Sequence, residues 1–236
     1  MIARAALFVT CLADTLYPSV GIATVTVLER LGVSVSFPRE QTCCGQMHMN
    51  SGYEDEAREL ARRFVDVFAD EPVVVTPSAS CAAHVREHFP DLLGDDARGI
   101  PDRVVELSQL LVDHLGVTDL GARLDGTATY HPTCHSLRML HVGDSPPRLL
   151  RDVAGLELVE LPEADECCGF GGTFAVKNAA VSSAMLADKL ANIESTGADV
   201  VCACDMSCLM HIGGGLRRTG SRVRALHLAE ILAGAE

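Results

Sequence analysis

Ten cysteines in a chain of 236 residues restrict the fold and function of this sequence more than any other feature. Eight of them form two series with one order: a single cysteine, a Cys-Cys-Gly triplet, and a cysteine with histidine three positions later. Matched cysteines lie 123 to 127 positions apart. The series are Cys11, Cys43, Cys44 and Cys81, and Cys134, Cys167, Cys168 and Cys208. The repeat predicts two tandem copies of one cysteine-rich module, at residues 1–118 and 125–236, with the boundary between Gly116 and Gly126.

Between the cysteines, expected strands alternate with helical patterns. The clearest helix is expected to begin at Ser51, which forms a capping-box pair with Glu54. Strands are expected at residues 5–10, 33–37, 73–76, 127–130, 156–161, 199–203 and 223–226. The alternation predicts an α/β fold of two pseudo-symmetric modules, built from βαβ units with mostly parallel sheets. Because ligands in such folds gather at the carboxyl ends of strands, the cysteine sites are expected there.

Adjacent cysteines followed by glycine favour metal binding over a disulfide. A bond between neighbouring cysteines closes a strained ring, whereas glycine accepts positive φ and lets the chain fold tightly around a ligand. Both thiolates then reach one multi-iron cluster. A single Zn²⁺ also binds four thiolates, but its usual paired Cys-x₂₋₄-Cys spacing is absent. The pattern predicts an iron–sulfur cluster in at least one module, with zinc in one module as the alternative.

Several further side chains are candidates for these sites. His84 and His211 follow the third cysteine of their series by one helical turn and are expected near the metal, as ligands or as hydrogen-bond donors. Cys204 is a candidate ligand of the second site, whereas Cys202 is interpreted as a small buried residue. Three residues that flank Cys134 are candidates for binding a substrate carboxylate or transferring a proton, with a structural role favoured for each: His131, His135 and Arg138.

Charge and hydropathy limit the class of protein. A formal net charge of −13 argues against nucleic acid and anionic membranes as partners, because both require a basic face. The short apolar start before Cys11 is interpreted as a first strand and not as a signal peptide. No apolar run approaches the length of about eighteen residues that a membrane span requires. We therefore expect a cytoplasmic protein without membrane insertion.

The motifs around the cysteines are long enough to indicate a family. They are Glu166-Cys-Cys-Gly-Phe-Gly-Gly-Thr-Phe174, Cys134-His-Ser-Leu-Arg138, Asp205-Met-Ser-Cys-Leu-Met-His-Ile-Gly-Gly214 and Ser78-Ala-Ser-Cys81. With them the sequence resembles the CCG cysteine-rich proteins, which include the cysteine-rich subunit of heterodisulfide reductase and the glycolate oxidase iron–sulfur subunit. The resemblance is strongest to the lactate utilisation protein A family and runs from the first expected strand to the last expected helix.

This resemblance implies an iron–sulfur electron-transfer subunit of a multi-protein oxidoreductase that oxidises L-lactate to pyruvate. It implies that each of the two cysteine series holds one cluster, either [4Fe–4S] or a non-cubane variant. The sequence departs from the wider family pattern at two positions, because His84 and His211 stand where the family has the last cysteine of Cys-x-x-Cys. With that departure the resemblance does not guarantee the five-thiolate non-cubane form, and a four-thiolate [4Fe–4S] cluster or a zinc in one module stays open.

The chain lacks both the closely spaced cysteine run of ferredoxin clusters and a GxGxxG element after a strand. Electrons are therefore expected to pass to or from a partner, a ferredoxin-type iron–sulfur subunit of the same complex, with a small 2-hydroxy acid as substrate. Two alternatives stay open at this point. One is a thiol–disulfide redox subunit of the heterodisulfide reductase type, and the other is a zinc-binding scaffold or sensor without catalysis.

Overall fold

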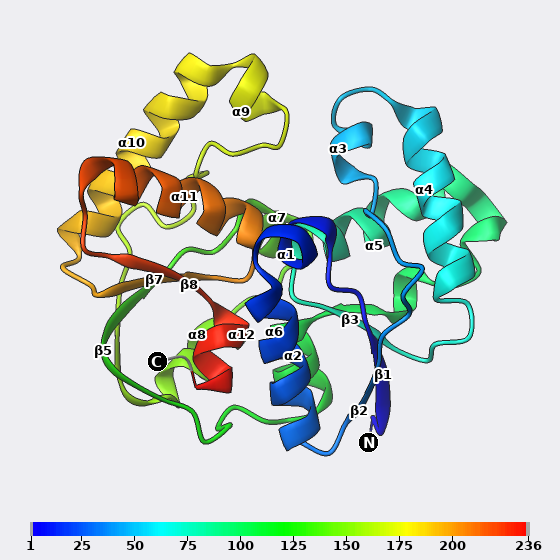
Figure 1. Ribbon diagram of the computed structural model, residues 1–236, viewed down its shortest axis with the longest axis horizontal. Coiled ribbons are helices and arrows are strands. Elements are labelled where there is room, and N and C mark those ends of the chain that lie inside the picture. The colour runs from blue at the N-terminus through cyan, green and yellow to red at the C-terminus, as the bar shows by residue number, and fades with distance from the viewer. Residues whose placement is uncertain (1, 235–236) are drawn as a thin grey trace. The chain divides into compact units, whose positions relative to one another are not determined.

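The computed structural model describes residues 2–234, which form two compact units divided between Val117 and Thr118. Each unit contains one four-stranded sheet in which every neighbouring pair of strands is parallel. Helices connect successive strands (Figure 1). The two sheets have the same topology, which confirms the predicted α/β class and the two tandem modules.

The first unit has the strand order β2-β1-β3-β4. Its strands are β1 (Arg4–Leu7), β2 (Ser34–Ser36), β3 (Val74–Thr76) and β4 (Val104–Glu106). Its helices are α1 (Cys11–Leu16), α2 (Pro18–Arg30), α3 (Gln46–Met49), α4 (Glu54–Val67), α5 (Ala79–Leu93) and α6 (Leu107–Gln109), with 3₁₀ turns at Gly94–Ala97 and Pro101–Arg103 and a π-helical turn at Leu110–His114. The cysteines of the first series follow β1, β2 and β3.

The second unit repeats this plan with the strand order β6-β5-β7-β8. Its strands are β5 (Arg123–Tyr130), β6 (Ala154–Val159), β7 (Val200–Ala203) and β8 (Arg224–His227). Its helices are α7 (Cys134–Arg138), α8 (Ser145–Arg151), α9 (Phe174–Lys177), α10 (Ala179–Ser195), α11 (Met206–Thr219) and α12 (Leu228–Ala233). The cysteines of the second series follow β5, β6 and β7 in the same way.

The structure corrects the expected start of α4. Its N-cap is Tyr53, and Ser51 belongs to a turn that closes α3. The backbone N–H groups of both Ser51 and Tyr53 donate to the carbonyl oxygen of His48. The turn therefore uses the residue that the capping-box pattern assigned to the helix start, and Glu54 becomes the first helical residue. The short strand β4 was not anticipated from the sequence.

The core of each unit lies between its sheet and the helices. In the first unit, the edge of the Phe8 ring contacts the Phe64 ring at a centroid distance of 4.9 Å, and Phe68 and Phe89 complete an aromatic cluster. The second unit has an aliphatic core instead, formed by Leu161, Leu190, Ile193, Val201, Ile212 and Leu216. Along residues 2–234, no helix is both long enough and apolar enough to cross a bilayer.

Candidate metal centres

The two Cys-Cys-Gly triplets adopt the same backbone turn. Gly45 and Gly169 have φ values of +91° and +89°, a region that residues with a side chain rarely adopt. A Cβ atom would also lie 3.3 Å from the Ala57 carbonyl oxygen at Gly45, and only 2.6 Å from the Ser182 carbonyl oxygen at Gly169. The turn lets each glycine N–H donate back to the first thiol of its pair, at 3.4 Å in both modules.

Four thiols of the first module converge from three segments. The Cys11 and Cys43 sulfur atoms lie 3.6 Å apart, and the Cys44 and Cys81 sulfur atoms lie 3.4 Å apart. Cys11 opens α1 directly after β1, and Cys81 lies in the first turn of α5 after β3. The structure thus brings together all four cysteines of the first series at the carboxyl edge of the sheet.

The second module repeats this arrangement. Cys134 forms a thiol hydrogen bond with Cys167, and Cys168 forms one with Cys208. Cys134 opens α7 after β5, and Cys208 lies in the first turn of α11 after β7. In both modules the second cysteine of the adjacent pair is buried and the first is half-buried. Each set therefore has one side toward the protein interior and one side toward solvent.

The thiols of each set compete for protons. A hydrogen bond from Cys11, followed in size by one from Cys44, lowers the pKa of Cys43 well below the ordinary value of a thiol. The hydrogen bond to Cys43 raises the pKa of Cys11, because Cys11 donates it. In the second module the pKa of Cys167 is lowered and that of Cys134 is raised for the same reason. The first cysteine of each adjacent pair is therefore the thiol with the lowered pKa in its set.

This chemistry fits a metal centre. Neighbouring thiols in hydrogen-bond contact cannot all ionise unless positive charge offsets their repulsion, and binding of a metal ion releases their protons. Thiolates are soft ligands that favour iron–sulfur clusters and zinc. Cys81 and Cys208 also lie in the first turn of α5 and α11, where the helix dipole stabilises negative charge.

Capping residues hold these two helix starts in place. The Ser78 hydroxyl accepts a hydrogen bond from the backbone N–H of Cys81 at 3.3 Å. The Asp205 carboxylate accepts from the backbone N–H of Ser207 at 3.1 Å and from its hydroxyl at 2.6 Å. Each cap lies between a strand end and the third cysteine of its series, so it fixes where that thiol is presented.

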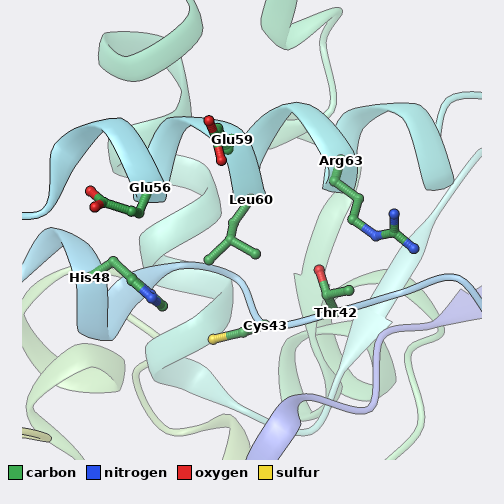
Figure 2. A pocket seen from close by; sticks show the side chains of 7 residues that line it. All are labelled: Thr42, Cys43, His48, Glu56, Glu59, Leu60 and Arg63. Atoms are coloured by element: carbon green, nitrogen blue, oxygen red, sulfur yellow. The ribbon is translucent and has the colours of Figure 1, made fainter.

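The first thiol set borders an open cleft of about 560 Å³ beneath α4 (Figure 2). Figure 2 shows Cys43 and His48 pointing toward one another, with Leu60 above them and Arg63 over Thr42. The proximity of His48 adds a smaller lowering of the pKa of Cys43. The remaining wall carries two carboxylates, Glu56 and Glu59. Through this cleft, Cys43 of the first set is open to solvent and small molecules.

The histidines that replace the last family cysteine occupy different surroundings. His84 is fully buried and packs against the rings of His88 and Phe89, at centroid distances of 5.2 and 5.7 Å. The His211 ring nitrogen lies 3.4 Å from the Ser182 hydroxyl, which donates to the Gly169 carbonyl oxygen at 2.8 Å. His211 is thus connected to the second Cys-Cys-Gly turn, and direct ligation by either histidine stays a prediction.

The two unmatched cysteines are both fully buried. Burial raises the pKa of Cys202, which keeps its thiol neutral in agreement with a structural role. The Cys204 sulfur lies 3.5 Å from the Tyr130 hydroxyl. Cys204 as an additional ligand of the second centre stays a prediction.

His131 lies near two thiols that are distant from it in the sequence. One of its ring nitrogens and the sulfur atoms of Cys168 and Cys208 all lie within 4.8 Å of one another. Burial lowers the pKa of His131 to about 4, so the ring is neutral near pH 7. The sequence interpretation favoured a structural role for His131. The one signal in the sequence is that Phe8 holds the matching position of the first module, so a polar residue replaces an apolar one there.

Comparisons with known proteins agree with this architecture. The CCG cysteine-rich domain matches the chain twice, at residues 5–86 and 128–213. "Lactate utilization protein A" of Geobacillus kaustophilus (strain HTA426) is 50% identical over 234 residues, covering 97% of this chain and 98% of that protein. The protein of the same name from Macrococcus caseolyticus (strain JCSC5402) is 47% identical over 235 residues, covering 97% and 96%.

The solved structures that are similar to this chain include a remote relative. The structure of a putative Asp/Glu racemase from Yersinia pestis aligns over 98% of this chain and 95% of the racemase chain. The two are 10% identical, and the TM-score is 0.39. The two domain matches and the near full-length relatives, in contrast, confirm the resemblance that the cysteine motifs indicated. The chain belongs to the lactate utilization protein A family of proteins with two CCG cysteine-rich domains.

Proposed function

We propose that this protein is the iron–sulfur subunit of a multi-protein system that oxidises L-lactate to pyruvate, with one cluster in each module. The observation that carries the proposal is the pair of matching four-thiol sets, each built around a Cys-Cys-Gly turn. The named activity of the relatives, lactate utilisation, supplies the substrate class.

The proposed ligands are the eight matched cysteines. Cys11, Cys43, Cys44 and Cys81 would hold the first cluster, and Cys134, Cys167, Cys168 and Cys208 the second. When bound, such clusters accept and donate one electron at a time. The chain itself provides thiolate donors, helix N-termini that favour negative charge, and buried walls that limit water on one side of each site.

Electrons are proposed to pass through the half-buried side of each set. Oxidation of L-lactate to pyruvate releases two electrons and two protons, so a one-electron carrier must act twice or use both clusters. The half-buried thiols of Cys43 and Cys167 lie toward solvent, where a partner protein can approach. The proposed partner is a ferredoxin-type iron–sulfur subunit of the same complex.

Complementation tests the proposal in a relative's own host. We expect this chain to restore growth on L-lactate to Geobacillus kaustophilus that lacks its Lactate utilization protein A. A Cys167→Ser/Cys168→Ser variant should fail to restore growth, whereas Cys202→Ala, which removes a buried thiol outside the proposed ligands, should succeed. The wild-type chain and both variants would also be purified and analysed for iron, sulfide and zinc.

Failure of the wild-type chain to support growth despite normal expression would contradict the role in lactate utilisation. Zinc in both modules without sulfide would contradict the electron-transfer role. Iron and sulfide together with growth on L-lactate would support both parts of the proposal.

A further inference from the structure

The two thiol sets are alike, but the protein layer behind them is not. In the first module, Phe8 and Phe64 pack edge to face in the buried layer between β1 and α4. Matching of Cys11 with Cys134 places His131 at the position of Phe8, three residues before the cysteine. An apolar residue in one module is therefore replaced by a nitrogen donor in the other.

The second member of this aromatic pair is also replaced. Space for a Cβ atom at Gly45 is closed by Ala57 and at Gly169 by Ser182, so these two residues correspond. Seven residues further along, Phe64 of α4 corresponds to Lys189 of α10. Lys189 is fully buried and donates from its ammonium to the Glu163 carbonyl oxygen at 2.7 Å.

Burial removes the polar groups of His131 and Lys189 from water, which is unfavourable unless they find new hydrogen-bond partners. His131 is fully buried, and both of its ring nitrogens lack a hydrogen-bond partner among the residues that the structure describes. A buried polar group left without a hydrogen-bond partner destabilises the folded protein. A phenylalanine fills the matching position in the first module without that cost. The histidine therefore indicates a partner that is neither side chain nor backbone.

The position of the ring identifies that partner. One ring nitrogen lies within 4.8 Å of the Cys168 and Cys208 sulfur atoms, which also form a hydrogen bond with each other. Lys189 interacts electrostatically with both His131 and Cys168, which places a positive charge close to the same group. A neutral imidazole donates a lone pair to iron or zinc, whereas the protonated ring does not.

We propose that His131 is a nitrogen ligand of the metal centre in the second module, so that the two centres of this protein have different donor sets. The first centre then has thiolates alone, and the second has thiolates and an imidazole. The proposal rests on the second module holding a metal centre, as proposed above.

The difference between the two modules affects the reduction potentials of their metal centres. An imidazole ligand is neutral, so His131 adds no negative charge to the second centre. The buried ammonium of Lys189 raises the reduction potential of that centre, because positive charge stabilises the more negative, reduced form. The second centre is therefore the one that is reduced first as electrons enter the protein.

Isotope labelling of the complete, anaerobically purified protein tests this ligand directly. We would compare the pulsed EPR spectra of protein grown with ¹⁴N-histidine and with ¹⁵N-histidine. The expected result is a strong nitrogen coupling, typical of a directly bonded imidazole, that changes with the isotope. Mössbauer spectra of ⁵⁷Fe protein cover the case of an EPR-silent centre, where we expect one iron site distinct from the all-sulfur sites. Both measurements use the wild-type protein, so neither depends on the correct folding of a variant.

Substitutions then assign the signal. His131→Phe, which installs the first-module residue, should abolish the nitrogen coupling and the distinct iron site. His131→Cys should keep the metal but lower the potential of one centre. The matched control is His227→Asn, which replaces a buried histidine of the same module whose ring accepts a hydrogen bond from the Ala229 N–H at the start of α12. It should leave the coupling intact.

The outcomes separate this inference from the proposed function. Iron and sulfide in both modules without a histidine nitrogen coupling would overturn the ligand and leave the iron–sulfur assignment standing. Persistence of the coupling in the His131→Phe protein would also overturn it. A second module that binds no metal would overturn both proposals together.

Discussion

At the scale of single residues, the two glycines of the Cys-Cys-Gly turns combine equal backbone strain with unequal space. Their φ values differ by only 2°, so an alanine would be strained to the same degree at both positions. The carbonyl oxygen that faces the missing side chain is 3.3 Å away at Gly45 and 2.6 Å away at Gly169. An alanine at Gly45 would need a small adjustment of its neighbours, whereas an alanine at Gly169 would require the backbone at the turn or at Ser182 to shift.

We therefore expect Gly169→Ala to be more damaging than Gly45→Ala. Gly45→Ala should lower the free energy of unfolding by about 1–2 kcal/mol, as expected for a left-handed backbone position. Gly169→Ala should exceed this value and reduce the metal content of the second module. Urea unfolding and metal analysis under anaerobic conditions measure both effects. Equal losses at the two positions would show that the close approach of Ser182 does not matter.

At the scale of elements, the strand–helix alternation and the cysteine spacing predicted most of the fold. Parallel strands with short connections place all strand ends of a module at one edge, so the thiols converge without any detailed knowledge of packing. The start of α4 was predicted wrongly because a capping-box pattern is local. The turn after α3 uses Ser51 for its own hydrogen bonds to His48, which the pattern does not contain.

The helix caps beside the third cysteines belong to this scale. Asp205→Ala should lower the free energy of unfolding by about 1 kcal/mol, because the first turn of α11 loses its N-cap. Cys208 lies in that turn, so binding of the second metal centre should weaken as well. Asp205→Asn keeps a side-chain oxygen as acceptor and serves as the control. The thermal unfolding and the metal content of both variants measure these effects. Equal results for the two variants would contradict this account.

At the scale of the whole molecule, the duplicated sequence became two units with the same sheet order, each with its own thiol set. The repeat could be predicted because the matched cysteines can be recognised directly in the amino-acid sequence. The sequence could not predict the proximity of His131 to Cys208, which are far apart in the chain and come together because β5 pairs with β7, the strand that leads into α11. The cleft beside Cys43 likewise depends on how α4 lies over α3.

Independent metal centres in the two modules are the central claim of this account. The most direct test is the content of iron, sulfide and zinc per chain, together with the visible spectrum, in anaerobically purified wild-type, Cys43→Ser/Cys44→Ser and Cys167→Ser/Cys168→Ser proteins. The account predicts two centres in the wild-type protein and the loss of one centre, a different one, in each double variant. A folded wild-type protein without metal, or unchanged metal content in either variant, would contradict it.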